Sequence, residues 1–508
     1  MEYNLKKTPL PVLTPVLDTV SEQSVDVDIT LPDYCPDVQR VLRCTMCPMI
    51  YSTSRSGGQL TVDGGVLLRV MYTDSVRSNI RSYEHTVPFT AGFAMRDVTD
   101  EVVVCTDTKV EYLNCRVHSP RKLSLHGAFS LYVTASCRGE VRFAYDGGRD
   151  DLQLLTETTS LCALSCLCSD SFSYAEDISL NDNPPIEAMI SHSLSVRLTE
   201  LRAVSGKIHL SAEGQLRLMY LSDLEQGSVE HLSYVFPISR VVDCDGVTDE
   251  TVLRAQLCLM SYDLRRNTDA LSEGTLLSLD MRLCFSAFGY EEQAVTMIAD
   301  AFSTSCDVSC TVDTASCIAD LHVDTYSHVE RGTVSTGDDS IASVMDLYAD
   351  GVTVTPSISN GKLILSTKVS VCMLLMNTDD QPVYLERAIS FDYETDSGGL
   401  SEVVAVDALA DSVSYRIVDE HTIELRADVR YTVCLCEPVT LSAVNAVTAL
   451  EDTAAIRDDS ALTLCYAQPG ERVWDIAKRY AARPDMLKAE NGIDGDRVEN
   501  AMMLLIPT

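Results

Sequence analysis

The sequence predicts a mainly β protein, with three β-rich sandwich or barrel-like repeats followed by a small α+β domain of order βααβ. Alternating apolar and polar residues recur in three blocks spaced by about 150 residues. The chain is 46% hydrophobic and 22% charged over 508 residues, as in folded globular proteins. The last 46 residues change to a helical spacing of apolar positions.

The clearest repeated element is a strand that begins half-buried and then becomes continuously apolar. It occurs at residues 59–72, 206–220 and 361–376. Polar turns with Asp74, Asp223 and Asp379 follow, and then come second strand candidates at 83–89, 231–237 and 383–391. A third alternating element occupies residues 122–134, 275–285 and 422–433. Because the spacing far exceeds the 20–50 residues of a solenoid repeat, each unit is predicted to be a whole domain.

The predicted boundaries follow these blocks. The first two repeats open alike, at residues 28–32 and 177–180, whereas the third has residues 340–345 in the equivalent place, for which we predict a short helix. We expect a tail at 1–24, repeats at 25–150, 155–300 and 310–440 (the last degenerate), a linker at 441–460 and the α+β domain at 461–508.

Charge restricts the possible partners of the chain. Its 39 Lys and Arg against 75 Asp and Glu give a net charge of −36, which disfavours nucleic acid and anionic membranes and favours basic partners. The segment from Thr463 onward is close to neutral, with seven acids and six bases. No stretch reaches the roughly 18 apolar residues of a spanning helix, and the N-terminus has no apolar core of a signal peptide. A cytoplasmic location without a transmembrane segment is therefore expected.

Nineteen cysteines are scattered along the chain. We expect mostly free thiols that pack as small apolar residues. The spacing closest to a metal site is Cys35, Cys44 and Cys47, which has no histidine beside it. No nucleophile-elbow, zinc-protease, dinucleotide or phosphate-loop motif is present, so the sequence predicts neither catalytic residues nor a metal site nor a cofactor.

The C-terminal segment contains a complete small domain. Residues 463–470 are predicted to be a strand and turn, residues 471–480 a helix, and residues 484–490 a second helix that Pro484 begins. Asn491 and Gly492 fit a left-handed helix cap, and residues 502–507 a closing strand.

Trp474 is the single tryptophan. Its helical phase with Ala477 and Tyr480 favours packing in the domain core over stacking on a sugar. Replacing Trp474 by alanine should then unfold this domain, at a cost of about 3–5 kcal/mol.

Two resemblances follow from these motifs. The opening at residues 25–41, the segment Tyr83–Phe89 and the turn Ser119–Leu123 resemble SPOCS domains, the spore-coat-associated repeats of spore-forming Firmicutes. This resemblance extends over roughly residues 25–438 and is weakest in the third repeat.

The C-terminal domain resembles LysM domains through motif residues in family order: Tyr466, Pro469, Gly470, Trp474, Ile476, Ala477, Tyr480, Leu487, Asn491, Gly492, Ile493, Leu505, Ile506 and Pro507. The resemblance implies a groove for N-acetylglucosamine-containing glycans such as peptidoglycan. It is formed by Gly470, Glu471, Arg472, Val473, Asn491, Gly492 and Ile493. Many members have Gly-Asp-Thr where this chain has residues 470–472, and the bulky Arg472 argues against a sugar in the groove.

The combination of both domain types is similar to the SPOCS-repeat spore coat morphogenetic proteins with a C-terminal LysM domain (SipL-like). The resemblance implies a non-enzymatic scaffold or adaptor in the mother-cell cytoplasm. It would bind the coat's basement-layer ATPase or another coat protein at the forespore surface. The alternative is a peptidoglycan-binding cell-wall protein whose acidic β repeats are spacers. A third class, a hydrolase targeted by LysM, would release muropeptides.

Overall fold

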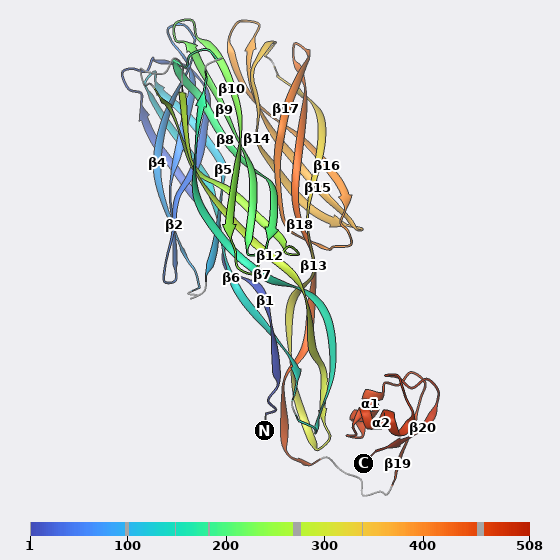
Figure 1. Ribbon diagram of the computed structural model, residues 1–508. Coiled ribbons are helices and arrows are strands. Elements are labelled where there is room, and N and C mark those ends of the chain that lie inside the picture. Colours follow the sequence, from blue (N-terminus) through green and yellow to red (C-terminus); the bar gives the residue numbers. More distant parts are fainter. Residues whose placement is uncertain are drawn as a thin grey trace.

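The computed structural model describes residues 2–96, 101–147, 149–180, 183–267, 276–337, 339–454 and 462–507. Antiparallel strands dominate it, and the helices lie in the C-terminal domain (Figure 1). The chain is mainly β with repeated small sheets, as the alternating sequence pattern predicts.

Within these described ranges, each of the three repeats has six strands. The first contains β1 (Lys6–Thr30), β2 (Val38–Ser56), β3 (Gln59–Asp74), β4 (Ile80–Ala94), β5 (Val102–Ser119) and β6 (Lys122–Asp146). The second contains β7 (Leu152–Ser179), β8 (Ala188–Val204), β9 (Lys207–Asp223), β10 (Ser228–Asp243), β11 (Val252–Asn267) and β12 (Leu276–Ser303). The third contains β13 (Cys306–Ser335), β14 (Ile341–Ser359), β15 (Lys362–Asn377), β16 (Pro382–Asp396), β17 (Glu402–Asp419) and β18 (Thr422–Ala454).

Within each repeat the strands form two three-stranded sheets of the same topology. In the first repeat these have the orders β1-β6-β5 and β2-β3-β4, and the second and third repeats follow the same plan. The core lies between the two sheets, because one face of each central strand is apolar. In β3, for example, Leu60, Val62, Leu68, Val70 and Tyr72 are nearly or fully buried and pack with residues of β6.

The first and last strands of each repeat are much longer than the rest and continue past the sandwich. Figure 1 shows β1, β6, β7, β12, β13 and β18 extending together from the sheets towards the N-terminal end. They share apolar clusters of their own, in which Leu10, Phe143, Leu161, Val295 and Ala443 come from five of these six strands. We call this part the stalk and the three packed sandwiches the head.

The N-terminal tail expected at residues 1–24 is instead part of a strand, because β1 begins at Lys6 and pairs with β6 along its length. Pro9, Pro11 and Pro15 lie within this strand. Strand β1 is at the edge of its sheet, where a residue without an N–H group is tolerated.

Two further expectations differ from the structure. The short helix expected at residues 340–345 is the beginning of strand β14, whose Ile341 is buried in the third core. Much of the linker expected at 441–460 belongs to the long strand β18, with Val444 and Val447 buried in the stalk. The rest, residues 455–460, lies outside the described part of the chain.

Candidate functional site

The C-terminal domain contains four short elements in the order βααβ. These are β19 (Thr463–Ala467), α1 (Val473–Arg479), α2 (Pro484–Asn491) and β20 (Met502–Ile506). Strands β19 and β20 pair in antiparallel register from Thr463 with Ile506 to Ala467 with Met502. Pro484 begins α2, and Gly492 ends it in the left-handed conformation at φ 62°.

The first predicted groove loop is bonded to a neighbouring segment of backbone. The amide of Gly470 donates to the carbonyl of Val498 (2.7 Å), and the amide of Val498 donates to the carbonyl of Glu471 (2.9 Å). The amide of Val473 donates to the carbonyl of Asp496 (3.0 Å). Arg472 is exposed, whereas Val473 is buried in the domain core. The side chain of Arg472 is therefore the one that this loop presents to solvent most fully.

The second predicted groove loop starts with a side chain that serves the fold. The Asn491 amide nitrogen donates to the carbonyls of Leu487 (2.9 Å) and Leu505 (2.7 Å), and its oxygen accepts from the amide of Leu505 (2.7 Å). Asn491 thus joins the end of α2 to β20. Gly492 is exposed and Ile493 is half-buried against the core. Binding of a ligand by these seven residues remains a prediction.

A different surface of this domain is apolar and exposed. Leu464 and Tyr466 on β19 are 52% and 59% exposed, and Met503 on β20 is 59% exposed. Tyr466 lies directly opposite Met503 in the sheet, and Leu464 lies opposite the half-buried Leu505. We call these four residues the outer sheet face. Strand alternation with the buried Cys465 and Ala467 could have revealed this face from the sequence.

Trp474 packs in the domain core and also contacts the stalk. Its ring lies edge-on to Phe302 of β12, with centroids 4.9 Å apart. The indole N–H donates to the Asp300 carboxylate at 2.8 Å, and Lys478 donates to the same carboxylate at 2.7 Å. Burial would raise the pKa of Asp300, but the hydrogen bonds from Lys478 and Trp474 outweigh burial and lower that pKa. Tyr480, expected in the same core, is 38% exposed.

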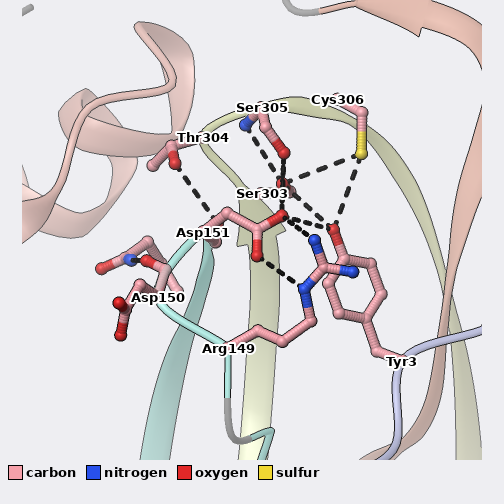
Figure 2. A network of polar contacts seen from close by, with 9 residues as sticks. Tyr3, Arg149, Asp150, Asp151, Ser303, Thr304, Ser305 and Cys306 are labelled. Carbon is pink, nitrogen blue, oxygen red and sulfur yellow. Dashed lines mark hydrogen bonds and ion pairs between the residues drawn. The ribbon is translucent and has the colours of Figure 1, made fainter.

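A second polar cluster lies at the end of the stalk, where the turns that connect the repeats meet (Figure 2). The Asp151 carboxylate accepts hydrogen bonds from Tyr3 (3.1 Å) and Ser305 (2.8 Å), and Arg149 Nε lies 2.9 Å from its other oxygen. The Tyr3 hydroxyl also lies 3.2 Å from Ser303 Oγ. These residues belong to the N-terminal segment, the β6–β7 turn and the β12–β13 turn.

The chemistry of this cluster fits a structural role. Burial would raise the pKa of Asp151, but the hydrogen bonds from Ser305 and Tyr3 and the charge of Arg149 lower it. Burial is the main reason why the pKa of Tyr3 is raised. The charged Asp151 carboxylate accepts hydrogen bonds from the Tyr3 phenol and from the Ser303 and Ser305 hydroxyls, so it joins the N-terminal segment to the β6–β7 and β12–β13 turns. The cluster therefore holds the ends of the three repeats together.

The cysteines lie apart from any metal-binding group within the described ranges. Each of the 19 cysteines is buried or half-buried. Cys35, Cys44 and Cys47 do not form a metal-binding group, and within the described ranges no three His, Cys, Asp or Glu side chains come together to do so. Where the chain is described, no helix is long and apolar enough to cross a membrane.

Comparison with known families identifies the first two repeats. The family model described as "SipL, SPOCS domain" matches residues 37–118 and 185–263. These ranges correspond to strands β2 to β5 of the first repeat and to most of β8 to β11 of the second. The chain therefore contains two segments of the SPOCS type. No curated protein and no solved structure matches it.

Proposed function

We propose that this chain is a non-catalytic scaffold or adaptor of spore coat assembly. Its LysM-like C-terminal domain would dock on a basement-layer protein of the coat at the forespore surface, within the mother-cell cytoplasm. The two SPOCS-type segments support a role in sporulation. The remaining support comes from the build of the C-terminal domain.

The observation that carries this proposal is the outer sheet face. Leu464, Tyr466 and Met503 are each more than half exposed on a domain of fewer than 50 residues. Water-exposed apolar side chains that adjoin one another are a common feature of protein-binding surfaces. The predicted sugar groove is less suited to binding, because Asn491 is engaged in internal hydrogen bonds and the first loop carries the bulky, exposed Arg472.

The outer sheet face also fits the charge of the molecule. The C-terminal domain is close to neutral, whereas nearly all of the net charge of −36 lies in the repeats. A neutral apolar face can approach a partner without the repulsion that the acidic head would exert on another acidic protein. Docking through this domain leaves the repeats free as the scaffold.

The test is localisation of the full chain, fused to a fluorescent protein, in a sporulating host. We expect the signal to encircle the forespore, and deletion of residues 461–508 to disperse it. Tyr466→Glu should also disperse it, because a charge on the outer sheet face opposes burial in an interface. The matched control is Tyr415→Glu, at a tyrosine 45% exposed in the third repeat, which should leave the ring intact. A ring that survives both the deletion and Tyr466→Glu would disprove docking by this domain.

A peptidoglycan pull-down separates this proposal from the cell-wall alternative. We expect little retention of the full chain on insoluble peptidoglycan, and retention that Arg472→Thr increases. Strong retention that is lost on Gly492→Trp, which would block the second loop, would favour glycan binding instead. Release of soluble muropeptides in the same assay would contradict the non-catalytic assignment.

A further inference from the structure

A cavity of about 420 Å³ lies where the three repeats meet in the head. Strands β2 and β3 of the first repeat, β8 to β11 of the second and β14 of the third line it. Its volume falls within the roughly 300–1,000 Å³ of small-molecule sites. The cavity is separate from the C-terminal domain, none of whose residues lines it.

Three arginines from three different strands line this cavity. Arg43 pairs with Asp350 (2.9 Å) and Arg217 pairs with Asp346 (3.1 Å). Both guanidinium groups also lie over the ring of Tyr348, at 5.4 Å and 5.0 Å from its centroid. The two acidic residues of β14 are thus already neutralised by arginines of the other repeats.

The third arginine has a donor without an acceptor. Arg69 Nε donates to Glu84 at 2.6 Å and Nη1 donates to the carbonyl of His192 at 3.0 Å. Its Nη2 is buried and has no hydrogen-bond partner within the described chain. The Arg69 side chain as a whole is 10% exposed. The Tyr262 hydroxyl, also at the cavity, lies close to the Arg69 side chain and donates to the His192 carbonyl (3.3 Å). A buried charged donor without an acceptor is unfavourable. Such donors are rare in folded proteins, so each one calls for an explanation.

Glu84, the partner of Arg69, is held in its charged form by its neighbours. Burial would raise the pKa of Glu84, but hydrogen bonding to His192 and the charge of Arg69 lower it to about 2. Glu84 is therefore charged at neutral pH. Since Glu84 occupies Nε, the free Nη2 is the donor that remains for a ligand.

The rest of the cavity wall is apolar and adaptable. Met49, Met219 and Met260 line it together with Leu194 and Leu232. Methionine side chains are flexible and polarizable, and they suit surfaces that accept ligands of varied shape. A ligand for this cavity would therefore have an apolar body and a hydrogen-bond acceptor at one end.

We propose that the cavity binds a small organic molecule that carries a carboxylate on an apolar body. Arg69 Nη2 donates to the carboxylate, since a bond between two charged groups is the strongest available to it. The methionines and leucines enclose the apolar body. Because strands of all three repeats line the cavity, such a ligand holds the head together, which is a function beyond docking by the C-terminal domain.

The test uses octanoate as the probe, with the full chain, in isothermal titration calorimetry. We expect one octanoate per chain, with acetate binding at least about tenfold more weakly because it lacks the apolar body. Octylammonium should also bind at least about tenfold more weakly, because it cannot accept from Arg69. Preference for octylammonium would mean that Asp346 and Asp350 dominate the site and would overturn the proposal.

Variants of the full chain locate the site. Arg69→Met should weaken octanoate binding by about tenfold or more, and Arg217→Met should weaken it less. Arg416→Met is the matched control, since the side chain of Arg416 is 74% exposed and pairs with Glu424, and neither residue lines the cavity; it should leave binding unchanged.

A labelling experiment does not depend on the folding of any variant. A photoreactive diazirine analogue of octanoate should modify the unaltered chain within residues 43–49, 191–194 or 259–262, which line the cavity. Absence of octanoate binding, or labelling confined to other regions, would overturn the proposal.

Discussion

The first two repeats and the third share one strand order but differ in the residues that fasten their sheets. In the first repeat the buried Tyr72, near the end of β3, donates its hydroxyl to the carbonyl of Pro36 at 3.2 Å. Tyr220 near the end of β9 donates in the same way to Pro184, also at 3.2 Å. Each proline lies in the segment that enters the second sheet of its repeat.

The third repeat lacks this hydrogen bond between a tyrosine and a proline carbonyl and has another one in its place. Strand β15 contains no tyrosine, and the segment before β14, residues 336–340, contains no proline. Its buried Tyr431 lies on β18 and bonds to Thr367 of β15, with the two hydroxyl oxygens 2.9 Å apart. Both ranges matched by the family model lie in the first two repeats. The third repeat thus keeps the strand order of the other two but joins its sheets through a different hydrogen bond.

A second difference concerns the residue opposite a phenylalanine in the second sheet. Gly64 faces Phe89 and Gly214 faces Phe236 in the first two repeats, whereas Thr367 faces Phe391 in the third. A side chain at either glycine would clash with the opposite ring. The phenylalanine ring therefore covers the glycine in the first two repeats. In the third repeat, the Thr367 hydroxyl forms a hydrogen bond with the Tyr431 hydroxyl.

The largest expected loss of stability comes from removing a buried tyrosine that is bonded to the proline carbonyl. Tyr220→Ala removes a side chain that is 1% exposed, together with its bond to Pro184, and should cost the second repeat about 3–5 kcal/mol of unfolding free energy. Hydrogen exchange measured by mass spectrometry should show this loss in β9 peptides and leave β15 peptides unchanged. Tyr415→Ala, at an exposed position, should change stability by about 0.5 kcal/mol or less. Equal effects of the two substitutions would contradict the fastening role.

The glycine positions should show the next largest effect. Gly214→Ala places a methyl group against the Phe236 ring and should destabilise the second repeat by about 2–3 kcal/mol. Gly351→Ala in the third repeat meets no atom within 4 Å and is the matched control, which should be neutral or slightly stabilising. The measurement is the urea midpoint of each variant. If Gly214→Ala is tolerated as well as the control, the ring does not cover the glycine tightly.

The turn after β3, at Asp74, makes the stability of the first repeat depend on pH and so allows a further test. Asp74 accepts hydrogen bonds from the amides of Val76 (3.1 Å) and Arg77 (2.8 Å) and from Arg81 Nε (3.0 Å). In the third repeat the neutral Asn377 accepts the equivalent amide bonds. Burial would raise the pKa of Asp74, but these hydrogen bonds and the charge of Arg81 lower it below the ordinary 3.8.

The lowered pKa of Asp74 determines how the stability of the first repeat changes with pH. The stabilisation by Asp74 is fully present above the ordinary value of 3.8 and is lost as pH falls through the lower folded-state pKa. The first repeat should therefore lose stability in this acidic range, and Asp74→Asn should reduce the loss while costing about 1–2 kcal/mol at neutral pH. Urea midpoints measured down to pH about 3 check this. An unchanged acid response in Asp74→Asn would exclude Asp74 as its cause.

The smallest expected effect is in the third repeat. Thr367→Val keeps the shape of the side chain but removes its hydrogen bond to Tyr431, so it should cost about 1 kcal/mol. Hydrogen exchange in β15 and β18 should report the change, with the first two repeats unaffected. A cost near zero would mean that the third repeat is fastened by apolar packing alone.

The sequence predicted the elements that depend on local patterns. The alternation at residues 59–72 corresponds to β3, because a period of two specifies a strand wherever one face is buried. Pro484 and Gly492 lie at the two ends of α2 for equally local reasons. Strand β1 was missed, because the prolines within it are acceptable only at a sheet edge, and its partner β6 is distant in the sequence.

The candidate site was predicted only in part, because contacts between domains leave no periodic signal. Burial of Trp474 was expected from its helical phase, and the structure confirms that burial. Its partners Asp300 and Phe302 lie more than 170 residues earlier, and no spacing rule connects them. The outer sheet face was overlooked, although the alternation of Leu464 and Tyr466 with buried neighbours was readable.

The contact between Trp474 and Asp300 gives the protein a built-in optical reporter. Since no other tryptophan exists, emission excited at the red edge of protein absorption comes from this one indole. Its N–H faces a carboxylate and its ring faces Phe302, so separation of the C-terminal domain from the stalk would replace both with water. The wavelength of that emission therefore distinguishes a chain whose last domain rests on the stalk from one whose last domain has been drawn away by a partner.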